Sequence, residues 1–285
     1  MLTMLLKASV FAVPLPGQHT ATPKYWAEID RWVTNFSPYS FSGSIAQPVM
    51  DDDGGLWFGV GQTAEHIDAR GRMTSSVFAT GPRTNIYGAA RAPDGRVWFS
   101  LGQTGFIGMI DPEGTPRTRV LVQRRYLPDI RAIAFATNGA LFFLDRGRSS
   151  IGRRSPDGHV DEVPIPGGAT QMTLCGDDIW VDGYSNGSPK LIAFPQTSLA
   201  APTPIRVGSG SITSLACDGQ HRVVAAYNRY AGYDGAVLRG NRSGLRAVSE
   251  LALQVSFVSA SPDGTIRVTG YATGIEIMSM RSRCY

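Results

Sequence analysis

Asp94-Gly95-Arg96-Val97-Trp98-Phe99 is the stretch that decides the fold, because it returns along the chain. It follows Asp53-Gly54-Gly55-Leu56-Trp57-Phe58 and precedes Asn138-Gly139-Ala140-Leu141-Phe142-Phe143, and weaker copies begin at Asp177, Asp218 and Asp263. Successive copies lie 38 to 45 residues apart. A tight turn followed by an aromatic strand, repeated at this spacing, indicates a β-propeller.

One repeat predicts four strands, at residues 87–92, 97–99, 106–110 and 117–122, joined by two turns that are rich in Asp, Pro and Gly. Six copies predict an all-β fold, a six-bladed β-propeller of four-stranded blades. The last blade lacks its outer strand, so we expect Trp26–Asn35 to close the ring beside Ile275–Met280. A seven-bladed ring is the alternative. Trp57, Trp98 and Phe142 should be buried at equivalent places between blades.

The chain has 285 residues, of which 42% are hydrophobic, and carries a formal net charge of +4. We expect residues 25–285 to form one propeller domain and residues 1–24 to be an N-terminal extension or residual signal segment. Only three lysines are present, so almost all positive charge is arginine. This bias fits either the recognition of anions or high-GC coding. No basic helix or long apolar stretch occurs in the sequence, so neither nucleic acid nor a membrane span is expected.

The three cysteines leave the redox state open. Cys175 and Cys217 occupy matching places in neighbouring repeats, where a bridge is conceivable. Equivalent positions in adjacent blades usually lie farther apart than the roughly 7 Å between Cα atoms that a disulfide allows, so separate thiols are favoured. Cys284 should be free. Met1–Val13 is apolar and fits either a signal remnant or a strand packed on the propeller, and we favour an exported or periplasmic protein over a cytoplasmic one.

The repeat resembles that of virginiamycin B lyase (streptogramin lyase). The resemblance rests on Tyr87-Gly88, Pro93-Asp94-Gly95, Val97-Trp98-Phe99, Ile107-Gly108-Met109-Ile110 and Pro112-Glu113-Gly114. A second match is Ile151-Gly152-Arg153-Arg154, followed by Pro156-Asp157-Gly158. The resemblance is good over about residues 43–165 and weak elsewhere. Related propellers of the NHL type share much of this pattern.

The resemblance implies a lyase that opens a cyclic depsipeptide by elimination, with a divalent metal held by histidines and glutamates of the late blades. The matching segments here, Gly208–Thr213 and Leu251–Val258, contain no histidine. The position of the motif's glutamate is acidic only at Asp145. Proton abstraction needs a positioned base and a hard cation needs oxygen ligands. We therefore expect no metal or cofactor, with magnesium as an alternative, and the catalytic residues stay unknown.

Arginine and tyrosine gather in the loops that should share one face of the propeller, and both residue types are frequent at binding hot spots. The predicted ligand-binding residues are Arg83, Tyr87, Arg131, Asp145, Arg146, Tyr184, Tyr227 and Tyr271. We expect a monomer that binds a small anionic or polar ligand, or a protein partner, at this face. The alternatives are a lyase or hydrolase with a relocated site built on Asp145, Arg146 and Glu276, and a purely structural interaction propeller. Polar loops without a function would show the same composition.

Overall fold

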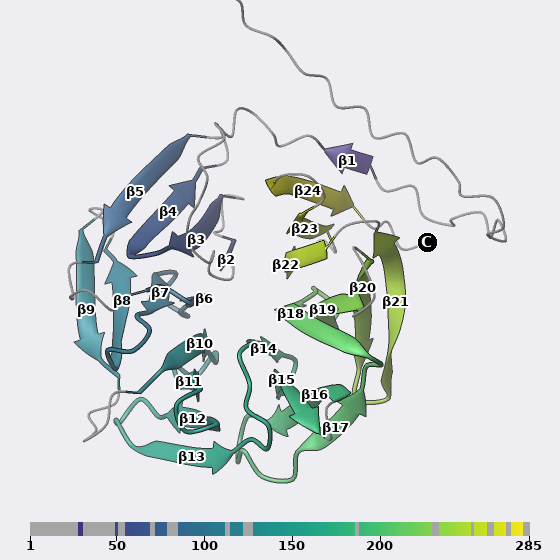
Figure 1. Ribbon diagram of the computed structural model, residues 1–285. Coiled ribbons are helices and arrows are strands. Elements are labelled where there is room, and N and C mark those ends of the chain that lie inside the picture. The colour runs from purple at the N-terminus through teal and green to yellow at the C-terminus, as the bar shows by residue number, and fades with distance from the viewer. Residues whose placement is uncertain are drawn as a thin grey trace, which may run out of the picture.

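In the computed structural model, every described element is a β-strand. The structure describes residues 28–30, 49–50, 55–68, 72–78, 85–111, 115–121, 128–185, 188–229, 234–251, 254–260, 265–271 and 275–281. None of the described segments is a helix of the length and apolar character needed to span a membrane. The predicted all-β propeller is confirmed: the sheets stand around a common centre like the blades of a fan (Figure 1).

The strands form six four-stranded antiparallel sheets, numbered here along the chain. Sheet 1 contains β2 (Val49–Met50), β3 (Leu56–Val60), β4 (Thr63–Ile67) and β5 (Met73–Val77). Sheet 2 contains β6 (Gly88–Arg91), β7 (Val97–Ser100), β8 (Phe106–Ile110) and β9 (Pro116–Val120). Sheet 3 contains β10 (Ile130–Phe135), β11 (Leu141–Asp145), β12 (Ser150–Arg154) and β13 (Val160–Pro164).

The remaining sheets contain strands of seven or eight residues beside shorter ones. Sheet 4 contains β14 (Met172–Cys175), β15 (Asp178–Ser185), β16 (Ser188–Pro195) and β17 (Thr203–Arg206). Sheet 5 contains β18 (Gly210–Cys217), β19 (Val223–Arg229), β20 (Gly235–Asn241) and β21 (Gly244–Leu251). Sheet 6 contains β22 (Gln254–Ala260), β23 (Thr265–Tyr271) and β24 (Ile275–Arg281), with β1 (Glu28–Asp30) as its fourth strand. The first strand of each of sheets 1–5, and β22 of sheet 6, lies nearest the centre (Figure 1).

The early strand β1 completes sheet 6. It pairs antiparallel with β24, and Ile29 lies opposite Met280. This is the pairing expected for Trp26–Asn35, although the described strand is limited to three residues. Because β1 covers the edge of β24, a strand that precedes the first repeat completes the sheet formed by the last repeat, and the ring is closed in this way. The described strands supply no seventh sheet.

The repeated turn has the conformation that its sequence predicts. Gly95 has a φ of 83°, and its N–H donates to the carbonyl of Ala92 at 2.9 Å. The side chain of Asp94 accepts the N–H of Arg96 at 3.0 Å, which closes the turn from the other side. A positive φ favours glycine over any residue with a Cβ. The Asp-Gly and Asn-Gly phrases therefore place a glycine at the positive φ of this turn in sheets 2 and 3, whereas the corresponding turns of sheets 4 and 5 have their positive φ at Gly176 and His221.

The second strand of each blade packs against both neighbouring blades, because successive side chains point to opposite faces of a strand. Trp98 lies in an apolar cluster with Ile133 and Phe143 of sheet 3, whereas Phe99 lies in one with Phe78, which follows sheet 1. Phe142 is fully buried between sheets 3 and 4. The predicted burial is confirmed for Trp98 and Phe142. Trp57 is only half-buried; its ring stacks on His66, with 4.2 Å between ring centroids, and its edge contacts Phe99 of sheet 2.

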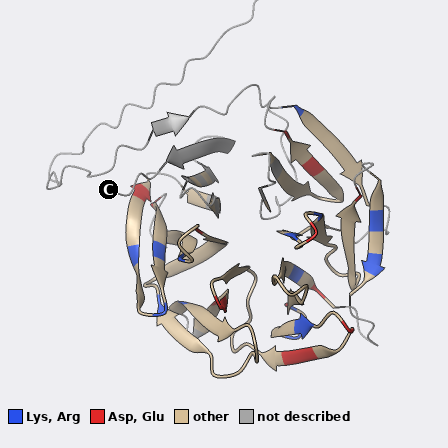
Figure 2. Ribbon diagram, turned by 180° about the vertical axis from the view of Figure 1, so that it is seen from behind, with Lys and Arg blue, Asp and Glu red and all other residues tan. Residues whose placement is uncertain are grey.

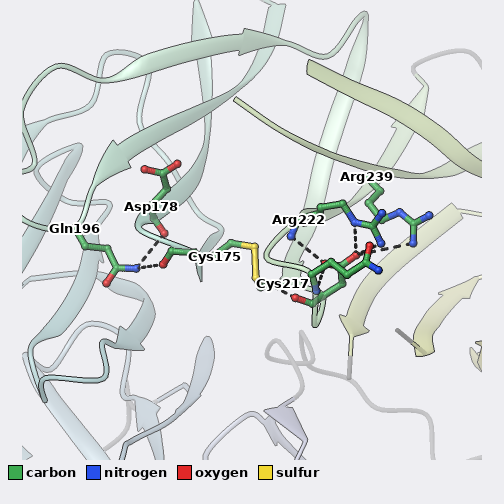
Figure 3. Close-up of a disulfide and its surroundings, with 9 residues drawn as sticks. Cys175, Asp178, Gln196, Cys217, Arg222 and Arg239 are labelled. Atoms are coloured by element: carbon green, nitrogen blue, oxygen red, sulfur yellow. Dashed lines mark hydrogen bonds and ion pairs between the residues drawn. A yellow bond between two sulfur atoms is a disulfide. The ribbon is translucent and has the colours of Figure 1, made fainter. Parts of the chain in front are cut away.

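A disulfide joins two neighbouring blades, in contrast to the separate thiols that the sequence favoured. Cys175 ends β14 and Cys217 ends β18, and their Cα atoms lie 5.1 Å apart (Figure 3). The general expectation for adjacent blades fails here because the ends of these two innermost strands come closer than about 7 Å. The bridge spans 42 residues of sequence, about one repeat.

Candidate functional site

Four side chains from sheets 2 and 3 meet at one end of the innermost strands, and we call them the Arg131 cluster: Tyr87, Asp129, Arg131 and Asp145. Tyr87 precedes β6, Asp129 precedes β10, Arg131 is the second residue of β10, and Asp145 is the last residue of β11. In a propeller, the segment that leads into a first strand and the end of a second strand lie on the same face. The four side chains therefore lie on one face of the propeller, where these two sheets meet.

Arg131 is held in place from two sides. Its guanidinium lies over the ring of Tyr87, 3.8 Å from the ring centroid. Its Nη2 donates to Asp129 Oδ2 at 2.8 Å, and the two side chains are 17% and 13% exposed. Asp129 is not among the site residues predicted from the sequence. The signal was available, since residues two apart in an extended segment lie on the same side and Asp129 precedes Arg131 by two.

Asp145 anchors the backbone of the same region. Its Oδ1 accepts the N–H of Asp129 at 3.1 Å, and the N–H of Arg146 donates to the carbonyl of Asp129 at 2.9 Å. Burial raises the pKa of the Asp145 carboxyl, backbone hydrogen bonds lower it, and the charge of Asp129 raises it further. The side chain is buried, beneath the exposed turn of residues 146–149. Its first role is therefore to tie the lead-in of β10 to the end of β11.

Asp182 does the same in sheet 4, which shows that this tie is a repeated structural feature. Its Oδ1 accepts the N–H groups of Thr170 and Gln171 at 2.6 and 2.7 Å, and its Oδ2 accepts the hydroxyl of Thr170 at 3.0 Å. Burial raises the pKa of Asp182 as well. The Asp182 carboxylate thus binds the segment that leads into β14 through both of its oxygens.

Unlike the Asp182 site, the Arg131 cluster contains buried polar atoms that make no hydrogen bond with the described part of the chain. Asp145 Oδ2, Asp129 Oδ1 and Arg131 Nε are buried, and they have no hydrogen-bond partner among the described residues. An unpaired buried polar group costs about 1–3 kcal/mol, so natural proteins usually satisfy such groups. Two acceptors and one donor in adjacent residues match a molecule that both donates and accepts, as a hydroxyl group does.

Arg146 is the accessible charge beside the cluster. Its side chain is exposed and makes no ion pair with any residue of the described segments. Arg148, in the same turn, lies 3.8 Å from Glu162, and Arg131 is already paired with Asp129. Across the rest of the ring, residues of both charges are interspersed (Figure 2). Arg146 is therefore the side chain of this region that is best placed to meet an anionic group.

Two other predicted site residues, Tyr184 and Tyr227, are not brought into this cluster. Tyr184 is exposed near the end of β15, in the neighbouring sheet 4. Tyr227 is buried in the apolar cluster between sheets 4 and 5, so its ring contributes to packing. Tyr271 ends β23, and nothing is described of its side chain. Arg83 lies outside the described residues.

The residues of the alternative enzymatic site are not all together. Asp145 and Arg146 are adjacent, but Glu276 belongs to β24, and β11 and β24 lie on opposite sides of the ring (Figure 1). In the described part of the chain, no group of three or more His, Cys, Asp or Glu residues is arranged to hold a metal ion. Any chemistry in sheet 3 would therefore depend on Asp145 and its immediate neighbours.

No protein-family model matches the chain. A curated relative is the virginiamycin B lyase of Nocardia farcinica (strain IFM 10152), which is 27% identical over 176 residues. These residues are 60% of this chain and 60% of the relative, so the match spans well under two thirds of that protein.

Solved structures share the fold over a longer range. The virginiamycin B lyase of Staphylococcus aureus, as an inactive variant with quinupristin, superposes with a TM-score of 0.64 at 17% identity, over 87% of this chain and 83% of that one. A gluconolactonase of Xanthomonas campestris superposes with a TM-score of 0.66 at 15% identity, over 83% and 86%. At these identities the likeness establishes the fold.

Proposed function

Because the chain is a diverged propeller of the streptogramin-lyase-like type, we propose that it is a ligand-binding module whose site is the Arg131 cluster. The ligand is a small polar molecule with hydroxyl groups and an anionic group. The observation that carries this proposal is the set of three unpaired buried polar atoms beside the exposed Arg146. A protein partner that presents the same groups is the alternative ligand.

The charges of the site favour a mixed ligand over a simple anion. Asp129 neutralises Arg131, and Asp145 adds a second carboxyl group, so the buried part of the site repels anions. Only a group that can donate hydrogen bonds satisfies the two carboxylate oxygens, and only an acceptor satisfies Arg131 Nε. Arg146 lies outside this buried part and can make a charge-assisted bond to a carboxylate. For the ligand to reach the buried atoms, the exposed turn of residues 146–149 must move.

Gluconate, a polyhydroxylated carboxylate, is a suitable probe, with sorbitol and acetate as its neutral and simple anionic counterparts. Gluconate should raise the melting temperature of the wild type in a concentration-dependent way, as mass action requires. Arg146→Gln should weaken binding by about 1.5–3 kcal/mol, the contribution of one charge-assisted hydrogen bond. The matched control is Arg148→Gln, because Arg148 lies in the same turn but faces Glu162. Equal binding by all three proteins would place the site elsewhere.

The second arginine extends this test. A double variant, Arg131→Gln with Arg146→Gln, should bind gluconate more weakly than Arg146→Gln alone. Arg131 also stacks on Tyr87, so the fold stability of the double variant must be measured separately. If the double variant binds gluconate as the wild type does, the face that carries the Arg131 cluster and Arg146 is not the binding surface.

A lyase or hydrolase of the same fold is the alternative function, supported by the buried Asp145 carboxyl with its raised pKa. Perturbed carboxyl groups are frequent at catalytic sites, but structural ties such as Asp182 perturb them as well. Under the binding-module proposal, magnesium should neither raise the melting temperature nor start the opening of a streptogramin B ring. Hydrolysis of a sugar lactone should also be absent. Turnover of either substrate that is lost in Asp145→Asn would replace the binding module with the enzyme.

The protein is proposed to work outside the cytoplasm, as a monomer. The Cys175–Cys217 disulfide supports this location, because such bonds persist in oxidising compartments and are rare in the cytosol. Fractionation of producing cells, with thiol alkylation before lysis, tests the location. A reduced protein in the cytosolic fraction would contradict it.

A further inference from the structure

We propose that the Cys175–Cys217 disulfide is a redox-sensitive lock on the boundary between sheets 4 and 5. Both cysteines end innermost strands, at the turns into the second strands, so the bond lies at the end of those strands away from the Arg131 cluster. The bond is thus independent of the proposed ligand site. It ties the turn that follows β14 to the turn that follows β18 (Figure 3).

The other contacts at this rim are not covalent. Arg242, in the turn between β20 and β21, forms a two-bond ion pair with Asp178: its Nε donates to Oδ2 at 2.8 Å and its Nη2 donates to Oδ1, and the two side chains are 42% and 17% exposed. Ion pairs near the surface usually contribute about 1 kcal/mol or less, and bidentate pairs such as this one contribute more than single-bond pairs. Gln196 bonds the carbonyl of Gly176 at 2.8 Å, but both residues belong to the segment around sheet 4 (Figure 3). The disulfide is therefore the main tie between these two turns.

Below the rim, the two sheets are held by packing that needs no covalent bond. Trp180 and Leu191 of sheet 4 share one apolar cluster with Leu215 and Tyr227 of sheet 5, and all four are buried. Apolar burial of this extent keeps two sheets together after a rim contact is lost. Reduction should therefore make the two turns mobile while the propeller stays folded, so the disulfide controls this boundary and not the whole fold.

The two sulfur atoms are unequally accessible, which sets the order of the reaction. Cys175 is buried and Cys217 is half-buried. A thiolate of a dithiol reductant attacks Cys217 Sγ, the sulfur–sulfur bond breaks, and Cys175 leaves as a thiolate that takes up a proton. The second thiol of the reductant then displaces Cys217. The products are two protein thiols and one oxidised dithiol, so electrons and protons balance.

Hydrogen exchange with and without a phosphine reductant tests the lock on the intact chain. In the wild type, reduction should increase exchange in the turns at residues 175–178 and 217–222, whereas peptides from residues 88–111 should be unchanged. The double variant Cys175→Ser with Cys217→Ser should show the faster exchange without reductant and no response to it. Cys284→Ser is the matched control and should behave as the wild type does.

Three results would overturn the lock. The first is unchanged exchange in both turns although alkylation shows that both cysteines are reduced. The second is faster exchange throughout the ring, since the bond would then support the whole fold rather than one boundary. The third is alkylation of Cys175 and Cys217 in the folded protein before any reductant is added.

Discussion

Replacing Trp98 by alanine tests how the blades are held together. Trp98 packs between sheets 2 and 3, where its ring meets Phe135 with 5.9 Å between centroids. The guanidinium of Arg119 lies 5.5 Å from the indole centroid. The side chain is 6% exposed, so alanine leaves a large cavity between two blades.

The expected cost follows from two opposing terms. A buried tryptophan removes about 150–250 Å² from water, which corresponds to about 4–6 kcal/mol at 25 cal/mol per Å². Against this, Trp98 Nε1 is buried without a hydrogen-bond partner among the described residues, and such a donor costs about 1–3 kcal/mol in the native state. Trp98→Ala removes this penalty together with the ring. We therefore expect a loss of about 3 kcal/mol, at the lower end of the usual range for large aromatic residues.

Phe142 is the matched comparison, because it occupies the equivalent place, is fully buried and has no polar atom. Phe142→Ala should cost about 4 kcal/mol, more than Trp98→Ala although the side chain is smaller. Trp98→Phe should stay within about 1 kcal/mol of the wild type, because it keeps an aromatic ring and removes the unpaired N–H. Urea unfolding followed by circular dichroism, with equal slopes for all variants, measures these differences. A cost below about 1 kcal/mol for Trp98→Ala would refute the packing argument.

Three further predictions concern closure, buried charge and close packing. Deleting residues 1–36 removes β1 and exposes the edge of β24. Light scattering should then show aggregation, or calorimetry should show loss of cooperative melting. Cooperative melting at the wild-type temperature would contradict this prediction. Burial raises the pKa of the Asp182 carboxyl, so the folded state holds this proton more tightly than the unfolded state does. The free energy of unfolding should therefore fall as the pH rises from about 3.8 through the raised pKa. Urea titrations at several pH values measure this fall, and Asp182→Asn should abolish it. Gly152→Ala should destabilise by about 1–3 kcal/mol, because the new Cβ would collide with the ring of Phe143. The comparison is Gly158→Ala, whose Cβ would meet only Arg154 Nη2 at 3.9 Å, so that its main cost is the positive φ of 94°. An unaffected Gly152→Ala would show that the ring can move.

The architecture could be predicted because the repeat specifies it locally. The turns at Gly95 and Gly139 have a positive φ that favours glycine, and the pair of bulky residues that follows each turn must pack on both sides of its strand. Errors arose where tertiary contacts decide. The ring of Trp57 stacks on His66 and is only half-buried, and the disulfide forms because β14 and β18 converge at their ends. Neither contact can be deduced from the spacing of the repeats.

The candidate site could be predicted only in part, because the sequence shows which residues share a face but not how their charges are paired. Arg131 was predicted as an anion ligand, yet Asp129 occupies one edge of its guanidinium and Tyr87 one of its faces. Asp145 marks the position of the motif's glutamate, yet its first function is to bind the backbone of Asp129. Arg146, which no described residue pairs, is then the only member of the predicted set in this region whose charge is free to select an anion. Binding at this face should therefore be more sensitive to substitution of Arg146 than to substitution of Arg131.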